Sequence, residues 1–285
     1  MSIVRSSVRS PVRSPVRDAL GGSSNAVVYD AASEAFFTAC TTPPIDAAKS
    51  AINALVVGLK ADAIWDDLDV FWPMALETEQ AGRLNLKNPG TFTLSAVNTP
   101  TFTAKYGWAG NGTTSYLNTG WDASTNGVQF VQNNASFGCW VDAGTDTGSN
   151  SAALMGSLDG SYQGNLVYPR TSSDTALARV NSNGTRDATL PVATRYGFTS
   201  FERTSSTVVE GYKNGAVMSG SGTPTSATIN SFDFFIGAIN INGTAAEYSN
   251  NRISCAFMGK SLGATKQTAL YNRFNTFRTA MAAIP

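Results

Sequence analysis

The chain has 285 residues, of which 14% are charged, and its 20 basic and 20 acidic side chains give no net charge. About 25% of charged residues is usual for a soluble domain, so polar uncharged residues must cover much of the surface. The sequence contains no histidine. This excludes Ser-His-Asp and Cys-His catalysis and histidine-ligated zinc sites. The length fits one large all-β domain, or a domain of about 200 residues with extensions.

Residues 1–25 are predicted to form an extended basic arm and a hinge. A four-residue unit repeats over residues 4–17, and Pro11 and Pro15 disfavour helix within it. Four of the 20 basic residues lie in this repeat, which leaves 16 basic against 20 acidic residues elsewhere, so the arm can pair with acidic surfaces, including those of sister copies. A disordered tail is the alternative. We expect anchoring through Val4, Arg5, Val8, Arg9, Val12, Arg13, Val16 and Arg17.

Other features of the sequence limit the setting of the protein. Four arginines without interleaved aromatic residues give no specific nucleic-acid site. No run of about 18 apolar residues is present, so no membrane span is predicted. The N-terminus lacks the apolar stretch of a secretory signal, so we expect synthesis in a cytoplasm.

The three cysteines are far apart and form no C-x-x-C motif, so a metal or redox motif is not expected. We expect reduced, buried thiols. Cys139 and Cys255 lie on strands that both have the pattern of core strands, which would make them neighbours. Cys40 lies in an irregular region and is the candidate for a cross-link to another chain.

Residues 26–90 are predicted to form a small helical and irregular subdomain. A short strand is expected at 27–29, and a dense apolar stretch follows at 65–72. A second short helix or turn is expected at 77–86. The main helix begins after Pro43 and Pro44, and its apolar residues recur with helical spacing. These residues are Ile45, Ala48, Ile52, Leu55, Val56 and Leu59.

Residues 91–285 are predicted to form an antiparallel β-sandwich that ends in a helix. Short runs rich in β-forming residues alternate with Gly, Asn, Ser and Thr turns every 8–15 residues or so. Asn214 and Gly215 suit the type I′ turn of a two-residue hairpin. The terminal helix is indicated by apolar residues at spacings of 4, 3 and 4. They are Leu270, Phe274, Phe277 and Met281.

Several motifs in this region resemble the C-terminal part of a concanavalin A-like (laminin-G or pentraxin-type) jelly roll. They are G-Y-K-N-G at 211–215, F-D-F-F-I-G-A at 232–238, R-I-S-C-A-F-M-G-K-S-L at 252–262 and A-L-Y-N at 269–272. The segments 63–88 and 102–120, together with the N-terminal repeat, resemble the front portion of tailed-bacteriophage virion proteins that carry such domains. The resemblance implies a mainly β protein: an antiparallel jelly-roll sandwich with a small helical N-terminal subdomain, an extended arm and a C-terminal helix.

The same resemblance implies a non-enzymatic structural protein of the virion. It would be a capsid decoration, head fibre, collar or tail fibre that contacts other virion proteins through the arm and forms a homo-oligomer such as a trimer. Its jelly roll would be lectin-like and could bind host-surface glycans weakly. A free carbohydrate-binding lectin is the first alternative, and a degenerate glycoside hydrolase is the second.

Paired carboxylates are the chemistry that a hydrolase of this fold would need. Glucanases on this jelly roll use an E-x-D-x-E strand, in which alternate residues face the same side. The chain has only six glutamates and none belongs to such a motif. Glu77 and Glu79 are separated by one residue but lie in the helical region. We therefore predict no hydrolase activity.

Glycan binding needs exposed aromatic rings and polar side chains. The candidates for this role are Trp108, Trp121, Trp140 and Tyr162, although most large aromatic residues of a sandwich belong to its core. Asp142, Asp146, Asp159 and Asp174 lie near turns, where a lectin of this fold can bind Ca²⁺. Asp before Gly also stabilises ordinary turns, and we favour that interpretation. No other cofactor is predicted.

Overall fold

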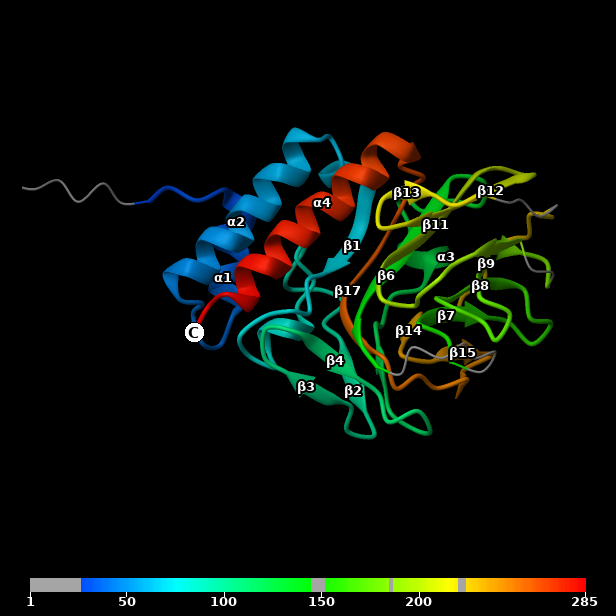
Figure 1. Cartoon of the computed structure of the whole chain (residues 1–285), viewed down its shortest axis with the longest axis horizontal. Coiled ribbons are helices and arrows are strands. Elements are labelled where there is room, and N and C mark those ends of the chain that lie inside the picture. Colours follow the sequence, from blue (N-terminus) through cyan, green and yellow to red (C-terminus); the bar gives the residue numbers. More distant parts are fainter. Residues whose placement is uncertain (1–26, 145–151, 185–186, 220–223) are drawn as a thin grey trace, which may run out of the picture.

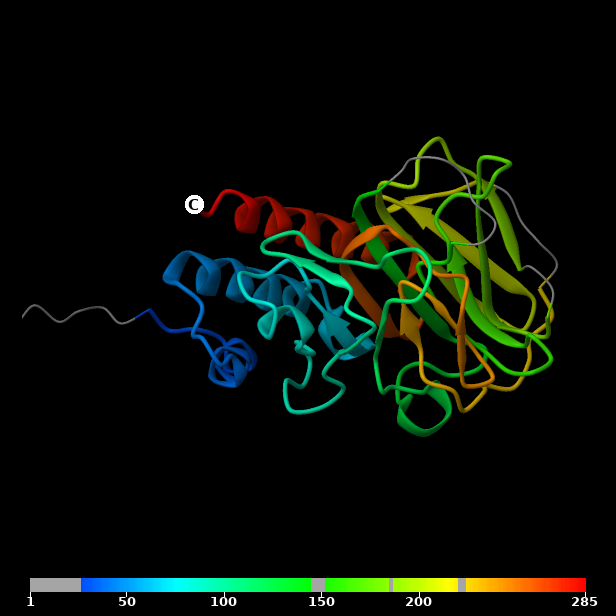
Figure 2. The same cartoon turned by 90° about the horizontal axis from the view of Figure 1, so that it is seen from below.

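The computed structural model describes residues 27–144, 152–184, 187–219 and 224–285, so the predicted anchoring residues 4–17 lie outside the described part. Two β-sheets pack face to face, and helices cover the outer face of one of them (Figure 1). Helix α2 (Asp46–Ala61) packs beside α4 (Gly263–Ala282), and α1 (Ala31–Ala39) contacts α2. Both views show the described chain beginning and ending at the helical end of the molecule (Figure 1, Figure 2).

The sheet next to the helices, called sheet A, has eight strands in the described part of the chain. In order across the sheet these are β13 (Ala216–Val217), β12 (Val208–Lys213), β11 (Gly197–Ser205), β6 (Ala135–Ala143), β17 (Arg252–Gly259), β4 (Gly107–Ala109) and β3 (Thr101–Thr103). The eighth, β1 (Leu68–Trp72), pairs antiparallel with β17. Strands β4 and β1 both pair with β17, at different positions along it. Strand β4 lies beside Arg252 and β1 lies beside Phe257.

The second sheet, sheet B, has nine strands in the described residues. Across the sheet they are β10 (Ala188–Pro191), β9 (Thr175–Ser182), β8 (Gly164–Tyr168), β7 (Met155–Leu158), β14 (Phe235–Ile236), β5 (Tyr116–Asn118) and β2 (Ser95–Val97). The hairpin of β15 (Ile239–Ile241) and β16 (Thr244–Ala246) joins through a parallel pairing of β15 with β7. A short helix, α3 (Ala123–Asn126), and two single turns, η1 (Trp65–Asp67) and η2 (Ala81–Arg83), complete the described elements.

Two large hydrophobic clusters hold the three layers together. One lies between the sheets, and the other lies between sheet A and the helices. Strand β1 contributes to both, because Trp72 faces the first cluster and Phe71 faces the second. Burial on both faces explains why Val70, Phe71 and Trp72 form an unbroken apolar run rather than alternating with polar residues.

Several predicted elements are confirmed. The structure has the antiparallel sandwich, the helix after Pro44 and the terminal helix, in which Leu270 and Phe274 are fully buried. The hairpin turn is also confirmed, since Asn214 and Gly215 both have positive φ, at 51° and 77°.

Other predictions are wrong. Residues 27–29 form no strand, and α1, which the sequence pattern did not predict, follows them. The boundary at residue 90 does not separate two units. One hydrophobic cluster joins Phe36 of α1 and Leu55 of α2 to Phe198 of sheet A and Phe274 of α4. The helical residues therefore complete the sandwich instead of forming a subdomain with a core of its own.

Candidate functional site

Three of the four predicted glycan-binding residues are buried. Trp108, Trp121 and Trp140 are 3%, 1% and 5% exposed. The Trp140 ring stacks on Tyr271 of α4 with the ring centres 5.5 Å apart, and Arg278 of the same helix lies over it. The prediction is wrong for these tryptophans, because helix α4 or the opposite sheet occupies the ring faces that a sugar would need.

Tyr162 is the predicted site residue that does reach the surface, with 53% of it exposed. It lies in the turn between β7 and β8, where its φ of +63° is in the left-handed region. Its backbone carbonyl accepts a hydrogen bond of 2.7 Å from Arg179. Its ring contacts no other aromatic ring of the described part of the chain. A single exposed ring gives a weak binding surface at most.

A different group of rings forms a surface on the outer face of sheet B. Tyr116 of β5 and Phe235 of β14 have ring centres 4.4 Å apart, and Tyr248 lies 6.2 Å from Tyr116. The next residues along these strands, Leu117 and Ile236, face the core between the sheets, so Tyr116 and Phe235 point outward. Phe235 is buried, while the two tyrosines are partly exposed. We call Tyr116, Phe235 and Tyr248 the aromatic cluster.

A carboxylate adjoins the aromatic cluster in the chain. Glu247 precedes Tyr248, and one of its carboxylate oxygens, Oε2, is buried without a hydrogen-bond partner. Burial raises the pKa of Glu247 above its ordinary value. Its φ of +54° lies in the left-handed region, which is uncommon for a residue other than glycine.

A narrow gap with room for about one water molecule borders Tyr116 of the aromatic cluster. Tyr116 lines it together with Pro100, Gly110, Gly237 and Asn251. A Cβ atom built on Gly237 would meet no atom within 4 Å, so the space at this glycine is open. The two partly exposed tyrosine rings are the part of this surface that a sugar ring can reach.

The glutamates of sheet A are committed to structural contacts. The Glu202 side chain is fully buried, and its Oε2 accepts hydrogen bonds from the backbone nitrogens of Leu262 and Gly263. The hydroxyl of Tyr212 lies 2.8 Å from a carboxylate oxygen of Glu202 and 2.8 Å from one of Glu210. This places two glutamates on one hydroxyl, with Glu202 sealed from any substrate.

The aspartates considered for Ca²⁺ have other partners. Asp142 is held by Arg252 and Arg278, at 2.5 and 2.8 Å. Asp159 accepts backbone hydrogen bonds within its turn, and Asp174 pairs with Arg170. Asp146 lies outside the described residues. Among the described residues, no three Cys, Asp or Glu side chains are grouped so that they could hold a metal ion.

The three cysteines are free and buried, as predicted. Cys139 and Cys255 lie on the neighbouring strands β6 and β17 but face opposite sides of sheet A, so one lies in each large cluster. Cys40 is 6% exposed, and burial together with the charge of Glu77 raises its thiol pKa to about 11. The predicted cross-link through Cys40 does not fit this position, because a second chain cannot reach the sulfur.

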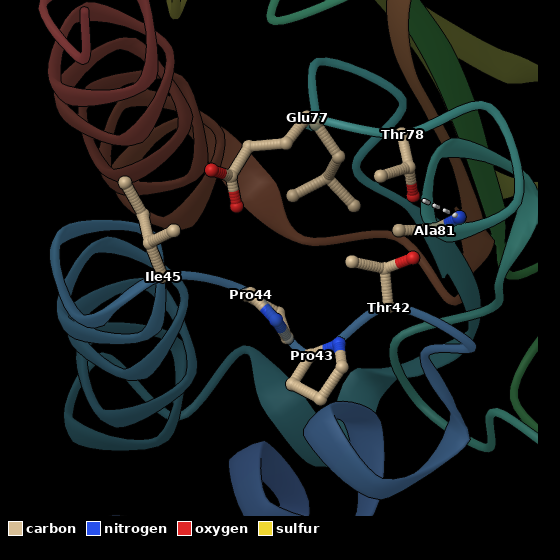
Figure 3. A pocket seen from close by; sticks show the side chains of 8 residues that line it. Thr42, Pro43, Pro44, Ile45, Glu77, Thr78 and Ala81 are labelled. Carbon is tan, nitrogen blue, oxygen red and sulfur yellow. Dashed lines mark hydrogen bonds between the residues drawn. The ribbon is translucent and has the colours of Figure 1, made fainter.

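A hollow lies at the helical end of the molecule, and Figure 3 shows it from close by. Its empty volume is about 360 Å³. The lining residues come from the connection between α1 and α2 and from the segment before η2: Thr42, Pro43, Pro44, Ile45, Leu76, Glu77, Thr78 and Ala81. The side chain of Glu77 extends toward Ile45 (Figure 3). We call this the proline hollow.

The chain matches no protein-family model and no curated protein. Among solved structures it is similar to a Trypanosoma rangeli sialidase mutant with trans-sialidase activity, at 12% identity, a TM-score of 0.48 and coverage of 79% of this chain and 39% of the sialidase. It is also similar to the binding domain of botulinum neurotoxin serotype D, at 8% identity and a TM-score of 0.46, with coverage of 74% of this chain and 52% of the toxin domain.

A third similar structure is domain 4 of an extracellular arabinanase from Geobacillus stearothermophilus, in complex with arabinotriose. The identity is 14% and the TM-score 0.40, with coverage of 72% of this chain and 98% of the arabinanase domain. The chain thus spans well under two thirds of the sialidase and of the toxin domain. Similarity of this extent concerns at most the β-sandwich, which the strand pairing shows independently. No described helix is long and apolar enough to cross a membrane.

Proposed function

We propose that the chain is a non-enzymatic structural protein of a bacteriophage virion, which is attached by its N-terminal arm and presents a lectin-like β-sandwich to glycans of the host surface. The observation that carries the proposal is the position of the two ends. The described chain begins and ends beside the helices, which cover sheet A, while β14, which holds one ring of the aromatic cluster, belongs to sheet B on the other side of the sandwich (Figure 1). Attachment and display would then use opposite faces of the sandwich.

The aromatic cluster supports the glycan part of this proposal. A pyranose ring would pack its C–H face on Tyr116 and Tyr248, as sugars do on exposed aromatic rings. The site has few contacts, so weak binding is expected, and several copies on one particle would strengthen it through avidity.

The absence of hydrolase chemistry is part of the proposal, and the position of Glu202 supports it. Retaining glycosidases place two carboxylates about 5–5.5 Å apart on either side of the bond to be cleaved. Here Glu202 is fully buried and accepts hydrogen bonds from the start of α4.

A glycan array tests the binding site. The full-length protein should bind a subset of glycans, and Tyr116→Ala and Tyr248→Ala should each weaken binding about tenfold, because each removes one stacking face. Tyr162→Ala is the matched control and should leave binding unchanged. A chelator should have no effect. Equal loss with all three variants, or binding that depends on Ca²⁺, would contradict the assignment.

Mass spectrometry of purified particles tests the virion part. The protein should be present in a fixed copy number, and deletion of residues 2–17 should remove it from the particle while it stays folded. Replacement of the four arginines by serine should weaken attachment and reduce its sensitivity to salt. A protein that binds glycans but is missing from particles would instead be the free lectin.

A further inference from the structure

Apolar residues form much of the wall of the proline hollow. Pro43, Pro44 and Ile45 form one side, and Leu76 and Ala81 form the other. Ile45 is 51% exposed, although it immediately precedes the first residue of α2. An exposed branched side chain beside two prolines gives a surface that can pack against a small apolar side chain of an extended peptide.

The charges around the proline hollow are mainly acidic. Glu77 lines it and makes no hydrogen bond or ion pair with any other residue of the described part. Asp46 and Glu79, next to lining residues in the chain, are 96% and 59% exposed at their side chains. Their basic neighbours Lys49 and Arg83 lie 3.7 and 3.9 Å away, near the limit for an ion pair. A peptide with a cation beside its apolar residue would therefore complement this surface.

The N-terminal arm is close enough to reach it. The described chain begins at Val27, and α1, of nine residues and so about 14 Å long, separates that point from the hollow. Nine residues lie between Arg17 and Val27, and they can span up to about 30 Å. The repeat of the same molecule therefore lies within reach of the hollow.

We propose that the proline hollow is the docking site for one Val-Arg unit of the chain's own N-terminal repeat, residues 4–17. The valine side chain packs against Pro43, Pro44 and Ile45, and the arginine guanidinium pairs with the carboxylate of Glu77. Proline in the repeat keeps the unit extended, which lowers the entropy lost on docking. The inference does not require attachment to a particle, so the two proposals can fail separately.

A peptide titration tests the recognition. The full-length variant in which the four arginines of the arm are replaced by serine leaves the hollow without its own ligand. A fluorescent peptide of residues 3–18 should bind this variant, as measured by anisotropy. Adding Glu77→Lys should raise the dissociation constant by at least about tenfold, and Glu77→Gln should raise it by a smaller factor, because the charge is removed and not reversed.

The control is Asp66→Lys, which reverses an exposed carboxylate that does not line the hollow. Binding that is absent, or that responds equally to Glu77→Lys and Asp66→Lys, would overturn the proposal. The Glu77→Gln variant keeps the test valid if Glu77→Lys unfolds, because glutamine preserves the size and shape of the side chain.

Disulfide trapping tests whether the docked repeat belongs to the same molecule. In the full chain, Ser10→Cys together with Thr42→Cys should form a cross-link that runs as a monomer on a non-reducing gel. Ser10→Cys with Thr189→Cys, an exposed position on β10, is the control and should stay unlinked. Dimers alone would show docking on a second copy, and no cross-link from Ser10→Cys or from the equivalent Ser6→Cys and Ser14→Cys variants would show no docking. Either result overturns the proposal.

Discussion

The carboxylate of Glu202, on β11, accepts a hydrogen bond of 2.8 Å from the backbone nitrogen of Leu262 at the start of α4. The same carboxylate oxygen also receives hydrogen bonds from the nitrogen of Gly263 and the amide of Gln267, both at 3.1 Å. No side chain of the helix itself supplies this cap. A residue 60 positions earlier in the sequence therefore neutralises the positive end of the helix dipole and fixes α4 on sheet A.

Glu202→Gln should lower the free energy of unfolding by about 1–3 kcal/mol. The substitution keeps the shape but removes the charge, and it places an amide donor where only acceptors fit. Urea unfolding followed by circular dichroism measures the change. Glu210→Gln is the control, because Glu210 is exposed and contacts only the hydroxyl of Tyr212. Equal losses in the two variants would contradict the capping role.

Asp67 should stabilise the folded protein at neutral pH and lose this effect in acid. Burial alone would raise its pKa, but the ammonium groups of Lys260 and Lys266, at 2.7 and 2.6 Å, outweigh burial and hold the pKa below its ordinary value. An acid with a lowered pKa in the folded state stabilises the protein above its unfolded pKa, near 3.9 for aspartate. That stabilisation is lost as the pH falls through the folded pKa.

Asp67→Asn should therefore destabilise the protein by about 1–2 kcal/mol at pH 7 and lose less stability than the wild type on going from pH 5 to pH 3. Urea unfolding at several pH values shows both effects. Asp46→Asn should change both quantities much less, because Asp46 is 96% exposed at its side chain and water screens its charge. A parallel pH dependence of wild type and Asp67→Asn would rule out this role for Asp67.

Replacement of Gly107 by alanine should destabilise the protein strongly. The φ of this glycine is +113°, and a Cβ atom would lie 2.1 Å from the carbonyl oxygen of Ile253. Gly107→Ala should cost more than about 3 kcal/mol, from the clash together with the strained backbone. Gly120 also has a positive φ, of +61°, but its Cβ would meet nothing within 4 Å. Gly120→Ala should cost only about 1–2 kcal/mol, so the difference between the two melting curves measures the close approach of the chains.

The three buried cysteines should react slowly with thiol reagents in the native protein. With a thiol pKa of about 11, Cys40 is only about 0.1% thiolate at pH 8. Burial raises the pKa of Cys139 and Cys255 as well. Ellman's reagent should react slowly with native protein and rapidly with three thiols in urea. Cys40→Ser should remove the fastest of the native reactions, and a rapid native reaction that survives this substitution would contradict the assignment.

Local signals predicted much of the fold. The spacing of apolar residues identified α2 and α4, and the pair Asn214-Gly215 fixed one hairpin. These signals operate within a few residues, where periodicity and turn geometry are set by the sequence. The pairing of β1 with β17 has no such signal, since Phe71 and Phe257 are 186 positions apart.

The site was less predictable for the same reason. The aromatic cluster takes its rings from three distant segments, at Tyr116, Phe235 and Tyr248, and only the folded sheet brings them together. Trp140 was misassigned because a strand of a sandwich normally has one face toward solvent, whereas helix α4 covers that face here. The outward position of Tyr116, next to the inward Leu117, was the one local indication available.

The layer shared by the first and last helices sets the order in which the protein can fold during its synthesis. About 200 residues separate the end of α2 at Ala61 from the start of α4 at Gly263. At about 5–20 residues per second, the ribosome needs roughly 10–40 s to make them. During that time Phe36 and Leu55 have no α4 to cover them. The N-terminal helices therefore cannot complete this hydrophobic cluster until the final helix emerges.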